Sequence, residues 1–218
     1  KYFYNIVKNP CQMTTKSLDF DTKHIKVLTA AGGDTLITWY FERDLKFWMK
    51  DQNFGKTLNR IFRELPVYGS VVIKIISGKI HFVDLRNFIV EQSADTLGQA
   101  EHIIERYNYT PNEFRKVGNE MEWENVEEAI AEHRETKKPY LTVYERYGEV
   151  KNEKEEYEFK RFYMVDIGAD KEVDRISGTR TSKGKFLKET TVDSIPYWEF
   201  HLEKIPGRWL GIGVIETL

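Results

Sequence analysis

The sequence has one cysteine, six prolines and a formal net charge of only -2. The lone Cys11 excludes an internal disulfide, and we expect it to be a buried small apolar residue. No stretch reaches the roughly 18 consecutive apolar residues that cross a bilayer, so we expect no membrane contact. The weak net charge gives no long-range attraction to phosphate, which argues against a basic DNA-binding surface.

The motifs of the commonest enzyme classes are missing as well. The five histidines stand far apart, and none has the partner spacing of a zinc site. There is no G-x-S-x-G nucleophile elbow, no Walker loop and no six-residue Rossmann glycine pattern. Gly211 and Gly213 form a lone G-x-G, which we interpret as close backbone packing at a helix entrance. We predict no enzyme activity, no catalytic residues, no cofactor and no metal.

One set of residues would suit a different prediction, a Mg²⁺-dependent nuclease. Asp84 follows a predicted strand, and Glu158 and Lys160 form an acid-x-lysine pair on another. Two carboxylates could hold the ion while the lysine steadied the attacking water or the scissile phosphate. Two predicted helices separate these parts, however, and acid-x-lysine pairs are common in a chain with 31% charged residues. A solvated strand face is the alternative interpretation.

A length of 218 residues with 40% hydrophobic and 14% aromatic residues is typical of a soluble globular protein. Apolar periodicity predicts two helices within residues 34–66, the first with Asp34 as N-cap and the second ending at Pro66. Alternating Val and Ile then predict a hairpin that turns at Ser77-Gly78, within a sheet region of residues 70–108. We expect the strand near residues 101–108 to pair back onto this hairpin.

The second half begins with a specific local signal. Thr110, Pro111 and Glu113 form a capping box, which predicts helices over residues 111–136 with Val126, Ile130 and Trp123 on the buried side. Residues 139–204 alternate in the manner of an antiparallel meander. The sequence thus predicts an α+β fold, with a mixed or antiparallel sheet packed by several helices, in one domain over residues 1–205.

Two groups of side chains are candidates for binding partners. The helical aromatic residues predict a core or a subunit interface, and the candidates for the interface are Trp39, Phe47, Trp48 and Trp123. The basic residues of the segment 171–188 suit contacts with phosphate groups, and the candidates are Arg175, Arg180, Lys183 and Lys185. An exposed hairpin kept soluble by lysine is the alternative for this segment.

Both ends of the chain have the character of interrupted elements. It opens on "KYFYNIV" without an initiator methionine and closes on "IPGRWLGIGVIETL". In the closing run Val214, Ile215 and Leu218 have helical spacing, so we predict the start of a helix within 206–218. The residues before it predict a hinge at Pro206, Gly207, Gly211 and Gly213. We therefore expect the chain to be an internal piece of a longer protein.

Four pieces of the sequence, taken in order, resemble the portal proteins of tailed double-stranded DNA bacteriophages. They are Tyr68-Gly69 before the strands, the "VDLRN" turn at 83–87, the "YTPNEF" helix start at 109–114, and the segment from Pro196 to Leu218. No single piece is diagnostic, and the likeness lies in their order along nearly the whole chain. The matched part corresponds to the wing of a portal subunit and the first turn of its stem helix.

The resemblance implies a structural role without covalent chemistry. Portal subunits form a closed ring, usually a dodecamer, at one capsid vertex of the virion, and they assemble in the host cytoplasm. The ring binds the terminase large subunit, the capsid protein and the tail adaptor, and double-stranded DNA passes through its channel during packaging and ejection. The ring contacts of this chain would be heterologous, since two different faces of each subunit must meet.

Overall fold

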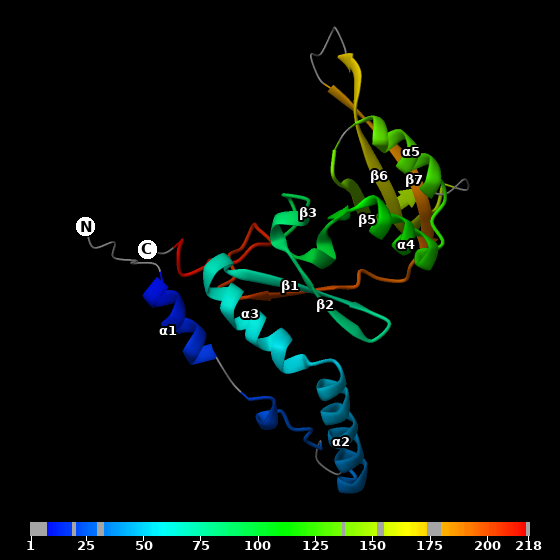
Figure 1. Ribbon diagram of the computed structural model, residues 1–218. Coiled ribbons are helices and arrows are strands. Elements are labelled where there is room, and N and C mark those ends of the chain that lie inside the picture. Colours follow the sequence, from blue (N-terminus) through cyan, green and yellow to red (C-terminus); the bar gives the residue numbers. More distant parts are fainter. Residues whose placement is uncertain are drawn as a thin grey trace, which may run out of the picture. The chain divides into compact units, whose positions relative to one another are not determined.

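The chain folds as two compact units in the computed structural model (Figure 1). The first comprises residues 1–84 and 196–218, and the second comprises residues 85–195. The structure describes residues 8–18, 21–29, 33–136, 138–151, 155–173 and 180–216, without the side chains of 168–173 and 180–183. The fold class is α+β, as predicted. The sequence predicted one domain over 1–205, whereas the chain leaves the first unit at residue 85 and returns to it at residue 196.

The first unit combines three helices with a small sheet. Its elements are α1 (Lys8–Leu18), η1 (Thr22–His24), α2 (Thr35–Asp51), α3 (Phe54–Tyr68), β1 (Ser70–Ile76), β2 (Lys79–Val83) and β8 (Tyr197–His201). Asp34 caps α2 as predicted, because its side chain accepts a hydrogen bond from the Leu36 amide. Helix α1 was not predicted from the sequence. The prediction that Pro66 ends α3 was wrong, since the helix continues to Tyr68 and stops at the left-handed Gly69.

The sheet of the first unit is antiparallel, in the order β2-β1-β8. Ser77 and Gly78 form the predicted two-residue hairpin turn with φ of 50° and 75°. Apolar residues of α3 pack on one face of this sheet, and the cluster includes Leu58, Ile61, Leu65, Val71 and Ile73. Figure 1 shows α3 running beside β1, with α2 continuing from its far end. The sequence placed the β8 residues in the second-half meander, but they pair with β1.

The second unit is a larger antiparallel sheet covered by two helices. Its elements are η2 (Leu85–Asn87), β3 (Phe88–Val90), η3 (Leu97–Gln99), β4 (His102–Tyr109), α4 (Pro111–Met121), α5 (Val126–Glu135), β5 (Leu141–Lys151), β6 (Tyr157–Val173) and β7 (Arg180–Thr191). The strand order is β3-β4-β5-β6-β7. The predicted pairing of β4 with the 70–84 hairpin was wrong, since β4 pairs with β3 and β5.

The core of the second unit lies between its two helices and the sheet. Phe114 of α4 and Ile130 of α5 pack against Val143, Val165 and Leu187 from three neighbouring strands. The predicted capping box is present at the start of α4: the Thr110 side chain accepts from the Glu113 amide, and the Glu113 carboxylate accepts from the Thr110 amide. Of the helices in the described ranges, none has both the length and the apolar character that a bilayer crossing requires.

Candidate interaction surface

Helix α2 turns an apolar side away from the residues on which it packs. At 100° per residue, Thr38, Glu42, Leu45 and Met49 share one side of the helix, and Met49 is its only buried residue. The opposite side carries Leu36, Tyr40, Arg43 and Phe47. We call the exposed apolar and aromatic side chains of this helix the α2 face; they are Leu36, Ile37, Trp39, Tyr40, Phe41 and Phe47. Between 46% and 65% of each is exposed.

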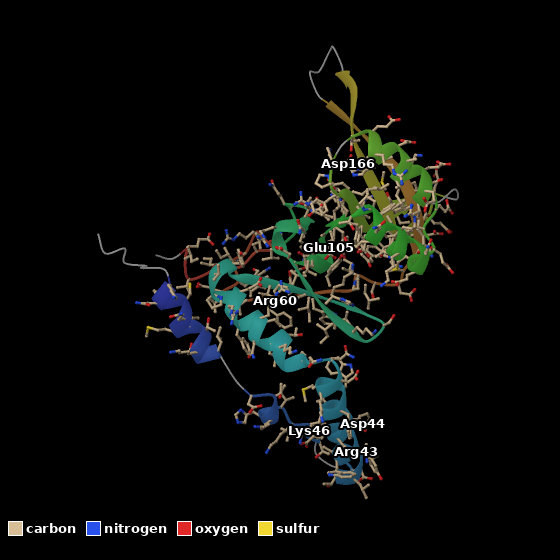
Figure 2. The ribbon with its side chains drawn as sticks, viewed as in Figure 1. Arg43, Asp44, Lys46, Arg60, Glu105 and Asp166 are labelled. Carbon is tan, nitrogen blue, oxygen red and sulfur yellow. The ribbon has the colours of Figure 1, made fainter. Side chains whose placement is uncertain are left out.

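The α2 face contains a compact aromatic and cationic cluster. The rings of Trp39 and Tyr40 meet edge to face with their centroids 5.1 Å apart. The Arg43 guanidinium lies 5.3 Å from the Trp39 ring and 5.0 Å from the Tyr40 ring, and Figure 2 labels it on the exposed lower part of the helix. Tryptophan, tyrosine and arginine are the residues most enriched at the energetic centres of protein interfaces.

Trp48 differs from the other aromatic residues of α2, because it anchors the helix. Its indole N–H donates to the backbone carbonyl of Gly78 at the hairpin tip, 3.3 Å away, and its ring lies 5.8 Å from that of Phe54. Trp48 is therefore half-buried within the first unit. Of the four predicted interface residues, Trp39 and Phe47 are exposed, and Trp48 holds α2 to the hairpin. The prediction for Trp123 was wrong.

Trp123 belongs to the core of the second unit and is not an exposed interface residue. Only 8% of it is exposed, and its ring lies 5.4 Å from Phe114 and 5.2 Å from Tyr163. Trp123 lies in the short connection between α4 and α5, and its ring packs into the core there. Its burial is consistent with the alternative that the sequence left open for the aromatic residues, a place in the core.

A second exposed aromatic surface lies on β8, which is an edge strand of the first unit. Trp198 pairs with Ile73 and Phe200 pairs with Val71, so both aromatic residues share the sheet face on which α3 packs. Their exposed fractions are 60% and 41%. This surface was not predicted from the sequence, although the alternation in "YWEFH" places two aromatic residues on one strand face. An edge strand with exposed rings is a place where another chain can dock.

The closing segment is bound to the first unit, which corrects the predicted hinge at Gly211 and Gly213. Both glycines are buried, and a Cβ at Gly211 would lie 2.7 Å from the Gly69 carbonyl oxygen. The Gly211 amide donates to the Ser70 hydroxyl at 2.6 Å, and the Val214 amide donates to the Pro66 carbonyl at 2.8 Å. These glycines permit close backbone packing on the junction of α3 and β1.

The other parts of the closing segment also depart from the prediction. Pro206 and Gly207 form a turn in which Gly207 has a φ of +86°. The described residues 206–216 contain no helix, and the predicted helix start is one turn, in which the Glu216 amide donates to the Gly213 carbonyl. Arg208 pairs with Glu216 at 3.0 Å across this turn. Residues 217 and 218 lie outside the described ranges.

The predicted phosphate contacts are mostly outside the described part of the chain. Arg175 is not among the described residues, and the side chains of Arg180 and Lys183 are not described. Lys185 is described, and it pairs with two carboxylates of α5, Glu128 at 2.9 Å and Glu132 at 2.6 Å. These partners raise the pKa of the Lys185 ammonium. Lys185 therefore ties α5 to β7 with its charge already compensated.

Neither unit alone brings together the residues of the nuclease alternative. Asp84 belongs to the first unit, whereas Glu158 and Lys160 lie on β6 of the second. The Lys160 ammonium pairs with Glu158 and with Glu189 on β7, and the hydrogen bond to Glu189 is the main cause of its raised pKa. Lys160, whose side chain is 16% exposed, thus forms one ion pair along β6 and one across to β7.

One buried polar cluster was not singled out from the sequence. Only 1% of Glu145 on β5 is exposed, and its carboxylate accepts hydrogen bonds from the hydroxyls of Tyr107, Tyr147 and Tyr163, each at 2.9 Å. Burial and the charge of Glu145 together raise the pKa of Tyr147 and of Tyr163. The alternation in "LTVYERY" could have indicated this cluster, since it places Glu145 on the same strand face as Leu141 and Val143. The cluster joins the three neighbouring strands β4, β5 and β6.

Within the described residues, one group has ligand atoms close enough to hold a metal ion, namely Glu91, Glu101 and His102. Glu91 already accepts hydrogen bonds from the Ser93 hydroxyl and the Glu101 amide, and the former is the main cause of its lowered pKa. Its carboxylate therefore has a structural use in closing the loop between β3 and β4.

Comparisons of the sequence with protein-family models and with curated proteins gave no match.

Proposed function

We propose that this chain is a structural subunit of a portal ring in a tailed double-stranded DNA bacteriophage. In this role it binds copies of itself at the capsid vertex of the virion and performs no covalent chemistry. The completed ring would bind the terminase large subunit, the capsid protein and the tail adaptor, and would pass DNA through its channel. The family is inferred from the four sequence pieces that resemble portal proteins in the same order. The exposed α2 face is the physical argument for self-association.

The size of the α2 face is the observation that carries the proposal. A large apolar side chain presents about 150–250 Å² when fully accessible. The six side chains of the face are between 46% and 65% exposed, so together they present on the order of 600 Å². The largest apolar patch on an ordinary monomer is about 300–600 Å², whereas a standard interface buries about 800 Å² per partner. Because these side chains span roughly 200° of the helix circumference, a partner must contact α2 on more than one side to cover all six.

A ring also needs a second surface, different from the first, on the same subunit. The edge strand β8 provides one in Trp198 and Phe200. A helical aromatic face and a strand-edge aromatic pair cannot be related by a two-fold axis, because each presents different residues. If they meet between neighbouring copies, the contact is heterologous, and it gives a ring where the rotation between copies closes and an open filament where it does not. Ring formation therefore requires a rotation that closes, which is what the microscopy below tests.

Electron microscopy of the protein produced from its complete reading frame tests the proposal directly. We expect closed rings with a central hole. The matched variants are Trp39→Ser with Phe47→Ser on the α2 face, and Tyr140→Ser with Tyr157→Ser as the control. The control pair lies on the second unit and is similarly exposed, at 53% and 67%. We expect the first pair to abolish rings and the second pair to leave them intact.

Light scattering across a range of protein concentrations gives the same comparison in solution. Loss of two interface aromatic residues removes about 2–4 kcal/mol of burial, because a fully buried large apolar side chain contributes about 1.5–3 kcal/mol and only 57% of Trp39 and 65% of Phe47 is left to bury. Such a loss weakens association by more than about tenfold. A complete protein that stays monomeric at every concentration contradicts the proposal. So does unchanged ring formation by the Trp39 and Phe47 variant.

A further inference from the structure

A cavity of about 460 Å³ lies in the first unit, beside the end of α2 and the beginning of α3. Four of its lining residues are lysines, namely Lys23 next to α2, Lys46 and Lys50 on α2, and Lys56 on α3. No carboxylate is among the described residues that line it. We call it the lysine cavity. Its volume falls within the range of about 300–1,000 Å³ that is typical of ligand sites.

Two of the four ammonium groups have no counter-charge in the described part of the chain. Lys23 pairs with Asp21 at 3.1 Å, and Lys46 pairs with Glu42 one helical turn away. Lys50 and Lys56 have no carboxylate partner among the described residues. Lys46 and Lys50 are also four residues apart on one helix, where like charges repel. The cavity therefore has an excess of positive charge that an anion would relieve.

The N-terminus of α3 adds amide donors to the same cavity. Asn53 precedes the helix in the left-handed region, with φ of 49°, and its side chain makes no capping hydrogen bond. The first-turn amides of the helix thus lack a side-chain acceptor; the Lys56 amide donates to the Asn53 carbonyl at 2.8 Å, so the amides of Phe54 and Gly55 are the ones a ligand could use. Gly55 lines the cavity, and a Cβ at this position would meet no atom within 4 Å. A glycine in the first turn of a helix costs helix stability, but it leaves the backbone open to a ligand.

We propose that the lysine cavity binds a phosphate group. A phosphate dianion offers acceptor oxygens for several ammonium groups and, at the same time, for the amides at a helix N-terminus. The group could belong to a free phosphate compound or to a nucleic-acid backbone, and the chemistry at the cavity is the same. The inference does not rest on the portal proposal, because it uses the charges and backbone of one unit in one copy of the chain.

The test is isothermal titration calorimetry of the protein with inorganic phosphate, a nucleoside monophosphate and a short DNA duplex. The key variant replaces both uncompensated charges, Lys50→Gln with Lys56→Gln. The control, Lys79→Gln with Lys116→Gln, changes the net charge equally at exposed lysines that do not line the cavity. We expect the cavity variant to lose about tenfold or more in affinity, since charge-assisted donors are removed, and the control to bind as the wild type does.

A third variant, Gly55→Ala, separates binding from folding. The alanine fits the helix and raises its stability, while its methyl group projects into the cavity. We therefore expect weaker phosphate binding with an unchanged or higher midpoint of thermal unfolding. Unchanged binding by this variant would overturn the part assigned to the α3 amides.

The three probes distinguish the sources of the phosphate group. Saturable binding of the two small probes, without the duplex, supports a free phosphate compound. Tighter binding of the duplex, with an affinity that falls steeply with salt, supports a nucleic-acid backbone. The proposal is overturned if the wild type binds none of the probes, if the Lys50 and Lys56 variant binds them equally well, or if the control loses as much affinity.

Discussion

Substituting Gly69 by alanine tests the backbone packing that holds the closing segment in place. Gly69 has a φ of +71°, and an added Cβ would lie 2.5 Å from the Gly211 carbonyl oxygen, with Gly213 and Ile212 backbone atoms also too close. The left-handed conformation costs an alanine about 1–2 kcal/mol. The clash adds to this strain, because the atoms that must move are backbone and not flexible side chains.

The cost of moving the closing segment follows from its hydrogen bonds. The Leu202 amide donates to the Gly69 carbonyl, the Ile212 amide to Glu203, and the Val214 amide to Pro66, at 2.8–3.0 Å. Loss of two or three bonds worth about 0.5–1.5 kcal/mol each gives roughly 1–4 kcal/mol. With the strain, Gly69→Ala is expected to destabilise the first unit by about 2–6 kcal/mol.

Gly78→Ala is the matched control for this experiment. Gly78 has nearly the same backbone conformation, with φ of +75°, but a Cβ there would meet nothing within 4 Å. It should cost only the strain, about 1–2 kcal/mol. The difference between the two variants therefore measures the close packing alone.

Urea unfolding followed by tryptophan fluorescence is the assay, because four of the five tryptophans lie in the first unit: Trp39, Trp48, Trp198 and Trp209. Hydrogen exchange of the Ile212 and Val214 amides reports the closing segment itself. Equal unfolding midpoints for the two glycine variants would refute the reasoning. Rapid exchange of those two amides in the wild type would refute it as well.

Three further predictions concern the second unit. Glu145→Gln keeps one acceptor oxygen and replaces the other with an amide that cannot accept from a tyrosine hydroxyl, so we expect a loss of about 1–3 kcal/mol in urea unfolding, whereas an unchanged free energy of unfolding would contradict a stabilising role for this carboxylate. Burial, followed by the charges of nearby glutamates, raises the pKa of Tyr109 to about 12; its contribution to stability is therefore full below pH 10 and declines as the pH rises from 10 to 12, which unfolding free energies across that range would show. Thr110→Ala removes a cap of α4 and should cost about 1 kcal/mol, whereas Thr110→Ser should restore most of it.

Local sequence signals predicted the elements whose cause is local. The Asp34 cap, the Ser77-Gly78 turn and the Thr110 capping box each involve backbone groups within a few residues, so the side chain and its target travel together in any fold. The predicted helix end at Pro66 was wrong by two residues. Proline lacks an amide and crowds the preceding turn, yet α3 continues through Val67 and Tyr68 and ends at Gly69.

Pairing between distant strands could not be read in the same way. The prediction paired β4 with the 70–84 hairpin and placed the β8 residues in the second-half meander, whereas β4 pairs with its sequence neighbours β3 and β5. In the structure β8 crosses back to β1, and the pair Ser70–His201 joins residues far apart in the chain. Strand alternation shows which side chains share a face, but it does not identify the partner strand.

The amino-acid sequence by itself determined the helices α2 to α5, the Ser77-Gly78 hairpin, the α+β class and the apolar side of α2, since each depends on spacing over a few residues. Only the tertiary structure decided that Trp123 is in the core while Trp39 and Phe47 are exposed, because periodicity shows that a side is apolar but not what covers it. It also decided that Gly211 and Gly213 pack against Gly69, and that four lysines meet at one cavity. Those contacts require segments that only the complete chain fold brings together.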